Sequence, residues 1–154
     1  MTNDPTLVAA VELLDRAMHA LRDAVDGLSA EQLNARLADE ANPLAVIVAH
    51  ALGATESWIS LAVGAELPPR DRPAEFRTVV DDPTAFLAEL DDRAAACRGL
   101  LERAEAFDAA RTGFALWTSE PDEPVTAAWA LLHALEHLSE HVGHAELTRQ
   151  LLEG

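Results

Sequence analysis

The sequence contains no lysine and no tyrosine, and its only cysteine is Cys97. A single cysteine excludes an intramolecular disulfide framework and any CxxC redox or zinc motif. All eleven basic residues are arginine, and 27 acidic residues give the chain a formal net charge of -16. Binding to a nucleic-acid duplex or to an anionic membrane requires a basic surface, so we expect neither partner.

The remaining composition is that of a soluble globular protein. The chain has 154 residues, of which 49% are hydrophobic and 25% are charged. This is enough for one domain with a full core, which we predict over residues 1–154. The N-terminus does not have the basic and apolar regions of a signal peptide. Residues 43–65 are long and apolar enough to span a bilayer, but basic anchors are missing at both ends. We therefore predict a buried bundle helix there and a cytoplasmic protein.

Four long helices are predicted from helix-start signals and from apolar residues at helical spacing. They cover residues 5 to about 26, 43 to about 63, 83 to about 106 and 125 to about 152. Asp4, Asn42 and Asp82 each precede a proline and are expected to cap the first three of these helices. A capping box over residues 29–32 opens a further short helix that ends at about residue 37.

The connections between these helices are long. Residues 66–81 are polar and contain prolines, so they are predicted as a loop, and a second loop with Gly113, Pro121 and Pro124 follows the third helix. The two connections, 64–82 and 107–124, are long enough to cross the bundle rather than turn tightly. No segment alternates with a period of two for long enough to predict a strand. Four long helices around one shared core predict an all-α four-helix bundle with long crossover connections.

Four of the six histidines lie within twelve residues, at His133, His137, His141 and His144. On one helix they fall within about 80° of each other, beside the apolar stripe, and they span roughly 16 Å of its axis. One metal ion cannot bind all four, but a pair spaced four residues apart can share an ion. The third ligand must then come from another helix, where His50 is the candidate. Three neutral imidazoles with an open position suit zinc, nickel or ferrous iron.

Each of these residues also has a purely structural interpretation. A buried histidine such as His50 is commonly a hydrogen-bonded core residue, and one HxxxH pair is a weak signal. Overlapping pairs beside the core, together with a histidine inside an apolar helix, favour a metal site. Cys97 lies on an apolar helical stripe and is interpreted as a core residue rather than a nucleophile. His19 has no such neighbours and is interpreted as a surface or packing residue, and no residue is selected as catalytic.

Two segments of the chain resemble the DinB-like superfamily of bacterial four-helix bundles. The first runs from the cap at residues 28–33 through the helix start Asn42-Pro43 to His50 and Trp58. The second is HALEHLSEHVGH, residues 133–144, in which three histidines are spaced four apart. The superfamily includes thiol-dependent S-transferases and mycothiol-dependent maleylpyruvate isomerases, and the resemblance covers nearly the whole chain.

The resemblance implies a particular ligand set. The family's metal ligands correspond to His50, His137 and His141. The expected metal is a divalent ion, zinc or nickel. Three further residues are expected to surround the ligands or to line the pocket: His133, His144 and Trp58. At the position of His144 the family usually has glutamine, and at His137 the isomerases tend to have glutamate. The resemblance also allows a homodimer.

Three hypotheses for function follow. The first is a metal-dependent transferase that uses a low-molecular-weight thiol, such as mycothiol, together with a small-molecule substrate. The second is a metal-dependent hydrolase or isomerase on the same scaffold, which would use metal-activated water. The third is a non-catalytic metal-binding module in a stress response. The fold alone does not choose among them.

Overall fold

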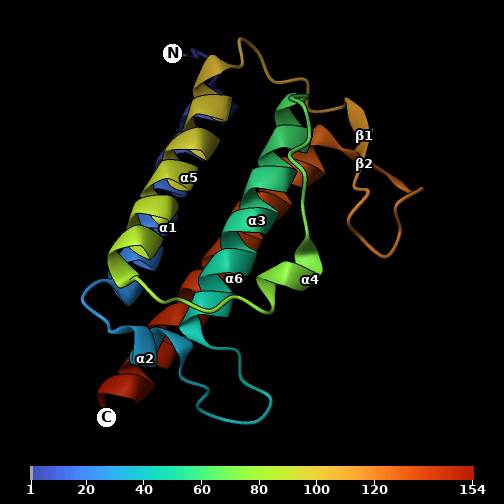
Figure 1. Ribbon diagram of the computed structural model, residues 1–154. Coiled ribbons are helices and arrows are strands. Elements are labelled where there is room, and N and C mark those ends of the chain that lie inside the picture. The colour runs from blue at the N-terminus through green and yellow to red at the C-terminus, as the bar shows by residue number, and fades with distance from the viewer. Residues whose placement is uncertain (1) are drawn as a thin grey trace.

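The computed structural model describes residues 2–154 and shows four long helices packed side by side (Figure 1). These helices are α1 Pro5–Val25, α3 Leu44–Val63, α5 Pro83–Arg103 and α6 Ala127–Glu153. The connections contain two short helices and two short strands: α2 Ala30–Asn34, α4 Arg72–Glu75, β1 Thr112–Phe114 and β2 Pro124–Thr126. The predicted four-helix bundle is confirmed.

The four long helices form a ring. α3 packs mainly on α6 and α5, and α1 packs on the same two helices from the opposite side. In Figure 1, α3 and α5 run in one direction, and α1 and α6 run in the other. The connection from α3 to α5, residues 64–82, therefore returns along the bundle and carries α4 across α3. We call this connection the strap. Residues 104–126 join the diagonal helices α5 and α6, so both long connections cross the bundle as predicted.

Most of the predicted helix starts are present. Side-chain oxygens of Asp4 and Asp82 cap α1 and α5, and Ser29 and Gln32 form the capping box of α2. The prediction for α3 is wrong in one respect. Pro43 itself, rather than Asn42, occupies the N-cap position, in extended backbone and with no side-chain hydrogen bond to the helix.

The long connections are more structured than the sequence predicts. Within residues 66–81, Asp71 accepts a hydrogen bond from the N–H of Ala74 and caps the one-turn helix α4. Within residues 107–126, β1 and β2 pair antiparallel, with Thr112 opposite Thr126. Three-residue strands are too short to produce a readable alternation. Three helix ends also differ from the prediction: α2 ends at Asn34, α5 ends at Arg103, and α6 begins at Ala127, after β2.

α3 is the central helix of the core. Of its 20 residues, 17 are buried beneath α5, α6 and the strap. By length and composition it is the one helix in residues 2–154 that could cross a membrane, but 78% of its most apolar window is buried inside the bundle. The core helix of a bundle has this same composition because it is covered on nearly every side.

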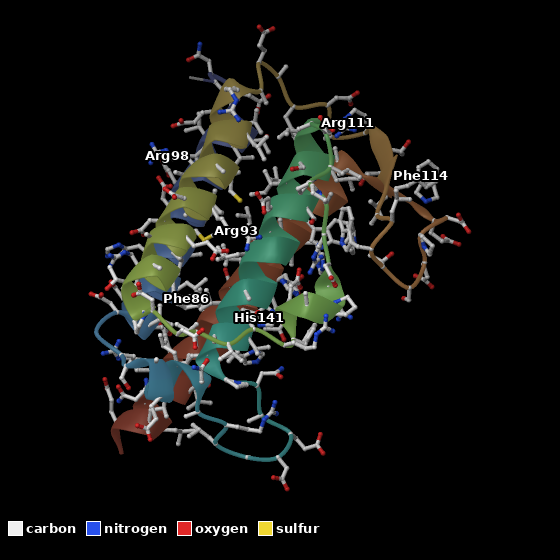
Figure 2. All side chains as sticks on the ribbon, viewed as in Figure 1. Phe86, Arg93, Arg98, Arg111, Phe114 and His141 are labelled. Carbon is white, nitrogen blue, oxygen red and sulfur yellow. The ribbon has the colours of Figure 1, made fainter. Side chains whose placement is uncertain are left out.

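An arginine from the β1 region closes the far end of α3. α3 ends at Gly64, whose φ of 73° is left-handed. The Arg111 guanidinium donates to the carbonyl oxygens of Leu61 and Ala62, the latter at 2.9 Å (Figure 2). The Leu61 carbonyl also accepts the backbone N–H of Gly64 at 3.3 Å, and Arg111 adds a donor for carbonyls in the last turn of the helix. Arg111 thus fastens the start of the hairpin to the end of the core helix.

Gly64→Ala is expected to destabilise the protein more than Gly27→Ala. Both glycines have a positive φ, where an alanine costs about 1–2 kcal/mol. A Cβ at Gly64 would also lie 3.2 Å from the Arg111 guanidinium carbon, whereas a Cβ at Gly27 meets nothing within 4 Å. Urea unfolding of both variants measures the difference, which we expect to be about 1 kcal/mol. Equal losses would show that Arg111 does not hold the end of α3.

Candidate metal centre

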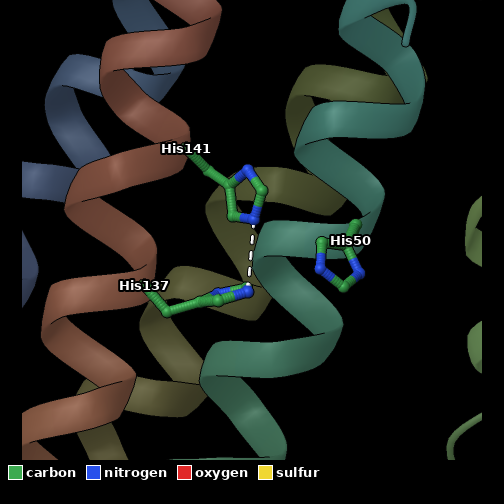
Figure 3. Close-up of side chains that lie close together, drawn as sticks. All are labelled: His50, His137 and His141. Atoms are coloured by element: carbon green, nitrogen blue, oxygen red, sulfur yellow. Dashed lines mark hydrogen bonds between the residues drawn. The ribbon is translucent and has the colours of Figure 1, made fainter. Parts of the chain in front are cut away.

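α3 and α6 bring three histidine side chains together in the interior of the bundle (Figure 3). His50 comes from α3, and His137 and His141 lie one turn apart on α6. The ring centroid of His50 is 5.1 Å from that of His137 and 5.0 Å from that of His141. One ring nitrogen of each histidine lies within 4.8 Å of the other two. We call these residues the histidine trio, and they are the same three that the sequence predicts as ligands.

The two histidines from α6 are held in the neutral form. Burial, followed by the neighbouring His141, lowers the pKa of His137 to about 3. Burial likewise lowers the pKa of His141 to about 4, with His50 as the next contribution. Neutral imidazoles have a free nitrogen lone pair, which is the form that binds a metal.

The spacing of the trio fits a divalent metal that prefers nitrogen ligands. The Nε2 atoms of His137 and His141 are 3.2 Å apart. Two nitrogens bound at 2.0–2.1 Å to one tetrahedral ion are about 3.3 Å apart, so this pair is already close to that arrangement. The Nδ1 atoms of both rings are buried and have no hydrogen-bond partner within residues 2–154. The protein itself thus leaves part of the hydrogen-bonding capacity of these rings unused.

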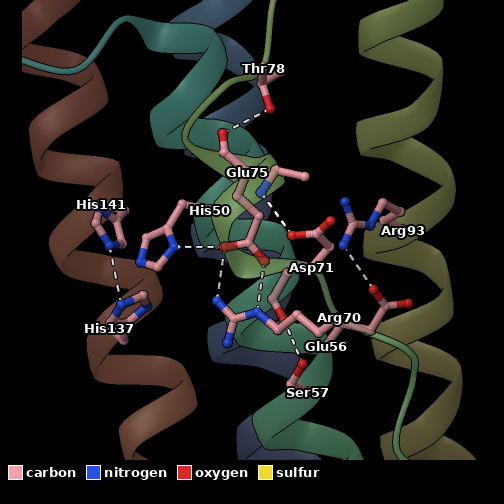
Figure 4. Close-up of polar contacts among 12 residues, drawn as sticks. His50, Glu56, Ser57, Arg70, Asp71, Glu75, Thr78, Arg93, His137 and His141 are labelled. Carbon is pink, nitrogen blue, oxygen red and sulfur yellow. Dashed lines mark hydrogen bonds and ion pairs between the residues drawn. The ribbon is translucent and has the colours of Figure 1, made fainter. Parts of the chain in front are cut away.

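The third histidine of the trio has a partner that the sequence did not predict. His50 Nδ1 lies 2.9 Å from Glu75 Oε2, and Arg70 donates to both oxygens of that carboxylate (Figure 4). Both partners lie in the strap, which was predicted as a loop. The helix-start signal Asp71-Arg72-Pro73 could have placed Glu75 on a helical turn. No local pattern could have placed that turn against His50.

The other predicted pocket residues lie around the trio. The His133 ring stacks on Trp129, with centroids 4.6 Å apart, and meets Trp58 edge-on at 5.0 Å. These rings form a wall beside His137. His144 is exposed, and its ring centroid is 5.5 Å from that of His141. The positions of these residues agree with the expected arrangement, and their roles stay predictions.

Two clefts open onto the trio. The first, of about 300 Å³, contains His50 and His137 and has no carboxylate in its lining. We call it the polar cleft; its further lining includes Trp58, Trp117, Arg70, Arg72, Thr118 and Ser119. The second, of about 420 Å³, contains His50 and His141. We call it the apolar cleft; its further lining includes Val46, Ile47, Phe76 and Leu147. A third cleft of about 540 Å³, between the strap and α5, contains no histidine.

Cys97 and His19, which the sequence analysis did not assign to the metal site, lie away from the trio. Cys97 is fully buried in α5, as predicted for a core residue. Burial raises the pKa of its thiol to about 12, and the nearby negative charge of Glu56 acts in the same direction. His19 is exposed on α1, where its Nε2 lies 3.3 Å from the carboxylate of Asp23. Neither Cys97 nor His19 belongs to the trio.

The folded protein is expected to resist thiol-modifying reagents. With a thiol pKa of about 12 and no exposed surface, Cys97 has neither the thiolate form nor the access that alkylation requires. Titration with a chromogenic disulfide at pH 8 measures this directly. One thiol per chain should react in guanidinium chloride, and almost none should react under native conditions. Fast labelling of the native protein would mean that Cys97 is accessible and ionised.

The fold and the trio together define the class of protein. The chain is a four-helix bundle with a long return strap and three inward-facing histidines from two of its helices, and the family model that it matches is of DinB-like type. A sequence model described as mycothiol-S-transferase matches residues 9–154. The chain belongs to this mycothiol-S-transferase family. No curated protein sequence matches the chain.

Two solved structures share the fold. One is described as a conserved protein from Enterococcus faecalis; it has 19% identity and a TM-score of 0.76, and the match covers 100% of this chain and 99% of that one. The other is YfiT from Bacillus subtilis, with 19% identity, a TM-score of 0.70, and coverage of 99% of this chain and 91% of that one. YfiT is described as "a probable metal-dependent hydrolase with an unusual four-helix bundle topology".

Proposed function

We propose that this protein is a metal-dependent enzyme that transfers a low-molecular-weight thiol to a small electrophilic substrate. The ligands of the metal are His50, His137 and His141, and the metal is zinc or nickel. The observation that carries the proposal is the convergence of three imidazoles from two helices, with ring nitrogens within 4.8 Å of one another, beside two open clefts. Mycothiol is the proposed thiol, supported by the family to which the chain belongs.

The two clefts support a reaction between two different molecules. The polar cleft has hydroxyl and guanidinium donors at Thr118, Ser119 and Arg72, which suit a cosubstrate rich in oxygen acceptors. The apolar cleft suits a hydrophobic electrophile. Both clefts include His50, so ligands in the two clefts would meet at the trio. A hydrolase needs only one organic ligand and water, and the second cleft favours transfer over hydrolysis.

The residues of the trio have defined tasks in this reaction. A divalent metal, when bound, supplies Lewis acidity that lowers the pKa of a thiol. The three imidazole rings offer nitrogen ligands to hold it and would leave a tetrahedral position open. The aromatic rings of Trp58, Trp129 and His133 pack against one another beside His137 and limit the directions from which a ligand can approach it. Thiol transfer then forms a bond from sulfur to the electrophile, and the thiol proton departs with the leaving group or enters the product.

A metal-dependent hydrolase is the second candidate function. The description printed for YfiT supports it, and water activated by the same metal would serve as nucleophile. A non-catalytic metal-binding module is the remaining alternative. A homodimer and a cytoplasmic location remain proposals as well.

Purified wild-type protein is expected to contain about one zinc or nickel ion per chain, and His137→Ala is expected to lose it, since two imidazoles alone hold such an ion poorly. Elemental analysis by mass spectrometry of untagged protein measures the content. The matched control is His19→Ala, which removes an exposed histidine outside the trio and should leave the metal content unchanged. Wild-type protein that contains no metal and takes up neither added ion would refute the proposed centre.

Turnover of an electrophile is expected to require added thiol. In the cobalt-substituted protein, a small thiol should change the visible absorption spectrum, and His141→Ala should abolish the change. Ester or amide hydrolysis without any thiol, together with a cobalt absorption spectrum that does not change when thiol is added, would favour the hydrolase instead. The comparison of thiol-dependent and thiol-independent turnover therefore separates the two candidate functions.

A further inference from the structure

The strap delivers a carboxylate to the outer side of the histidine trio. Glu75 stands at the end of α4, and its Oε2 lies 2.9 Å from His50 Nδ1. Both side chains are nearly buried, with exposed fractions of 11% for His50 and 10% for Glu75. The remaining ring nitrogen of His50, Nε2, is directed toward His137 and His141 (Figure 4). The two nitrogens of His50 therefore face two different partners.

Arg70 fixes the carboxylate of Glu75 in this position. Its Nε donates to Glu75 Oε1 at 2.7 Å and its Nη2 donates to Oε2 at 3.0 Å. Only 7% of the Arg70 side chain is exposed. A bidentate contact of this kind fixes both the position and the orientation of a carboxylate. Because Arg70 donates to both oxygens of Glu75, both oxygens serve as acceptors, and the contact with His50 is one in which Nδ1–H donates to Oε2.

The approach of Glu75 depends on a glycine in the middle of α3. A Cβ on Gly53 would lie 2.2 Å from Glu75 Oε1 and 2.9 Å from its carboxyl carbon. No side chain fits there while Glu75 is bound to His50 and Arg70. A glycine inside a helix costs about 1 kcal/mol relative to alanine, so Gly53 is unfavourable for α3 itself. The absence of a side chain at Gly53 therefore allows Glu75 to contact His50 and Arg70.

We propose that Glu75 is a positioning residue for the metal centre. It accepts the proton of His50 Nδ1, which fixes the tautomer with the lone pair on Nε2, facing His137 and His141. Arg70 orients Glu75, and Gly53 gives it room. In metal sites, a histidine held from behind by a carboxylate is oriented before the metal arrives and is a stronger ligand. This inference rests on the proposed function for the identity of the ligands, but the tautomer of His50 does not depend on a bound metal.

Zinc affinity, measured by competition with a chromophoric chelator, tests the proposal. Glu75→Ala is expected to weaken binding about 10–100-fold. Glu75→Gln keeps an acceptor without the charge and should recover part of that loss. The matched control is Glu56→Ala, which removes a similarly placed carboxylate of α3 that pairs with Arg93 at 2.9 Å and does not touch the trio. Zinc affinity in this control should stay within about two-fold of wild type.

Gly53→Ala tests the same contact without removing any polar group. The added methyl should displace the Glu75 carboxylate and weaken zinc binding as Glu75→Ala does. The double variant should show little further loss, because both changes break one interaction. Additive losses would show that Gly53 acts separately from Glu75 and would overturn this part of the inference.

The tautomer of His50 separates positioning from a general loss of stability. In metal-free protein labelled with ¹⁵N-histidine, NMR should show the Nδ1–H form of His50 in wild type and in Glu56→Ala, and a mixture of tautomers in Glu75→Ala. An unchanged tautomer and unchanged zinc affinity in Glu75→Ala would overturn the proposal. If wild type binds no metal, the proposed function fails, and the tautomer still decides whether Glu75 positions His50.

Discussion

The packing of α3 against α6 is the interaction on which the rest of this structure depends. α3 is buried on nearly all sides, so its single histidine has to face another element, and that element is α6. Three imidazoles placed there lose much of their hydration, which keeps the two from α6 neutral. Burial, which would be costly for a charged histidine, thus prepares the rings as ligands. Because this packing covers α3 on nearly every side, the helix is composed mostly of apolar residues and has the composition of a membrane-spanning helix.

The strap gives the trio its polar surroundings. Because α3 and α5 run in the same direction, the chain must return along the bundle between them, and this return passes over α3 at the level of His50. A tight turn between antiparallel helices would have placed no residue there. The topology therefore supplies both the carboxylate behind His50 and the guanidinium that holds it. The residues that shape the site come from a connection as much as from the helices.

Local spacing explains what the sequence could reveal. His137 and His141 could be predicted to share one face of a helix, because the helix period alone decides this. Asp4 and Asp82 could be predicted as N-caps, because capping is a contact within one turn. His50 was selected by its burial in an apolar helix. The contact from Glu75 to His50 could not be predicted, since it spans 25 residues across a segment without periodicity. The hairpin was missed because two three-residue strands leave no pattern, although their pairing is regular in the structure.

The buried position of Cys97 has a consequence for the proposed reaction with an electrophile. Amines and thiols are the side chains that such reagents attack most readily, and this chain has no lysine and only one thiol. That thiol is sealed in the core with its pKa raised to about 12. A reactive molecule that enters the apolar cleft therefore meets neither a lysine amine nor an accessible cysteine thiol. In the proposed reaction the added thiol would therefore meet no competition from a lysine amine or from Cys97.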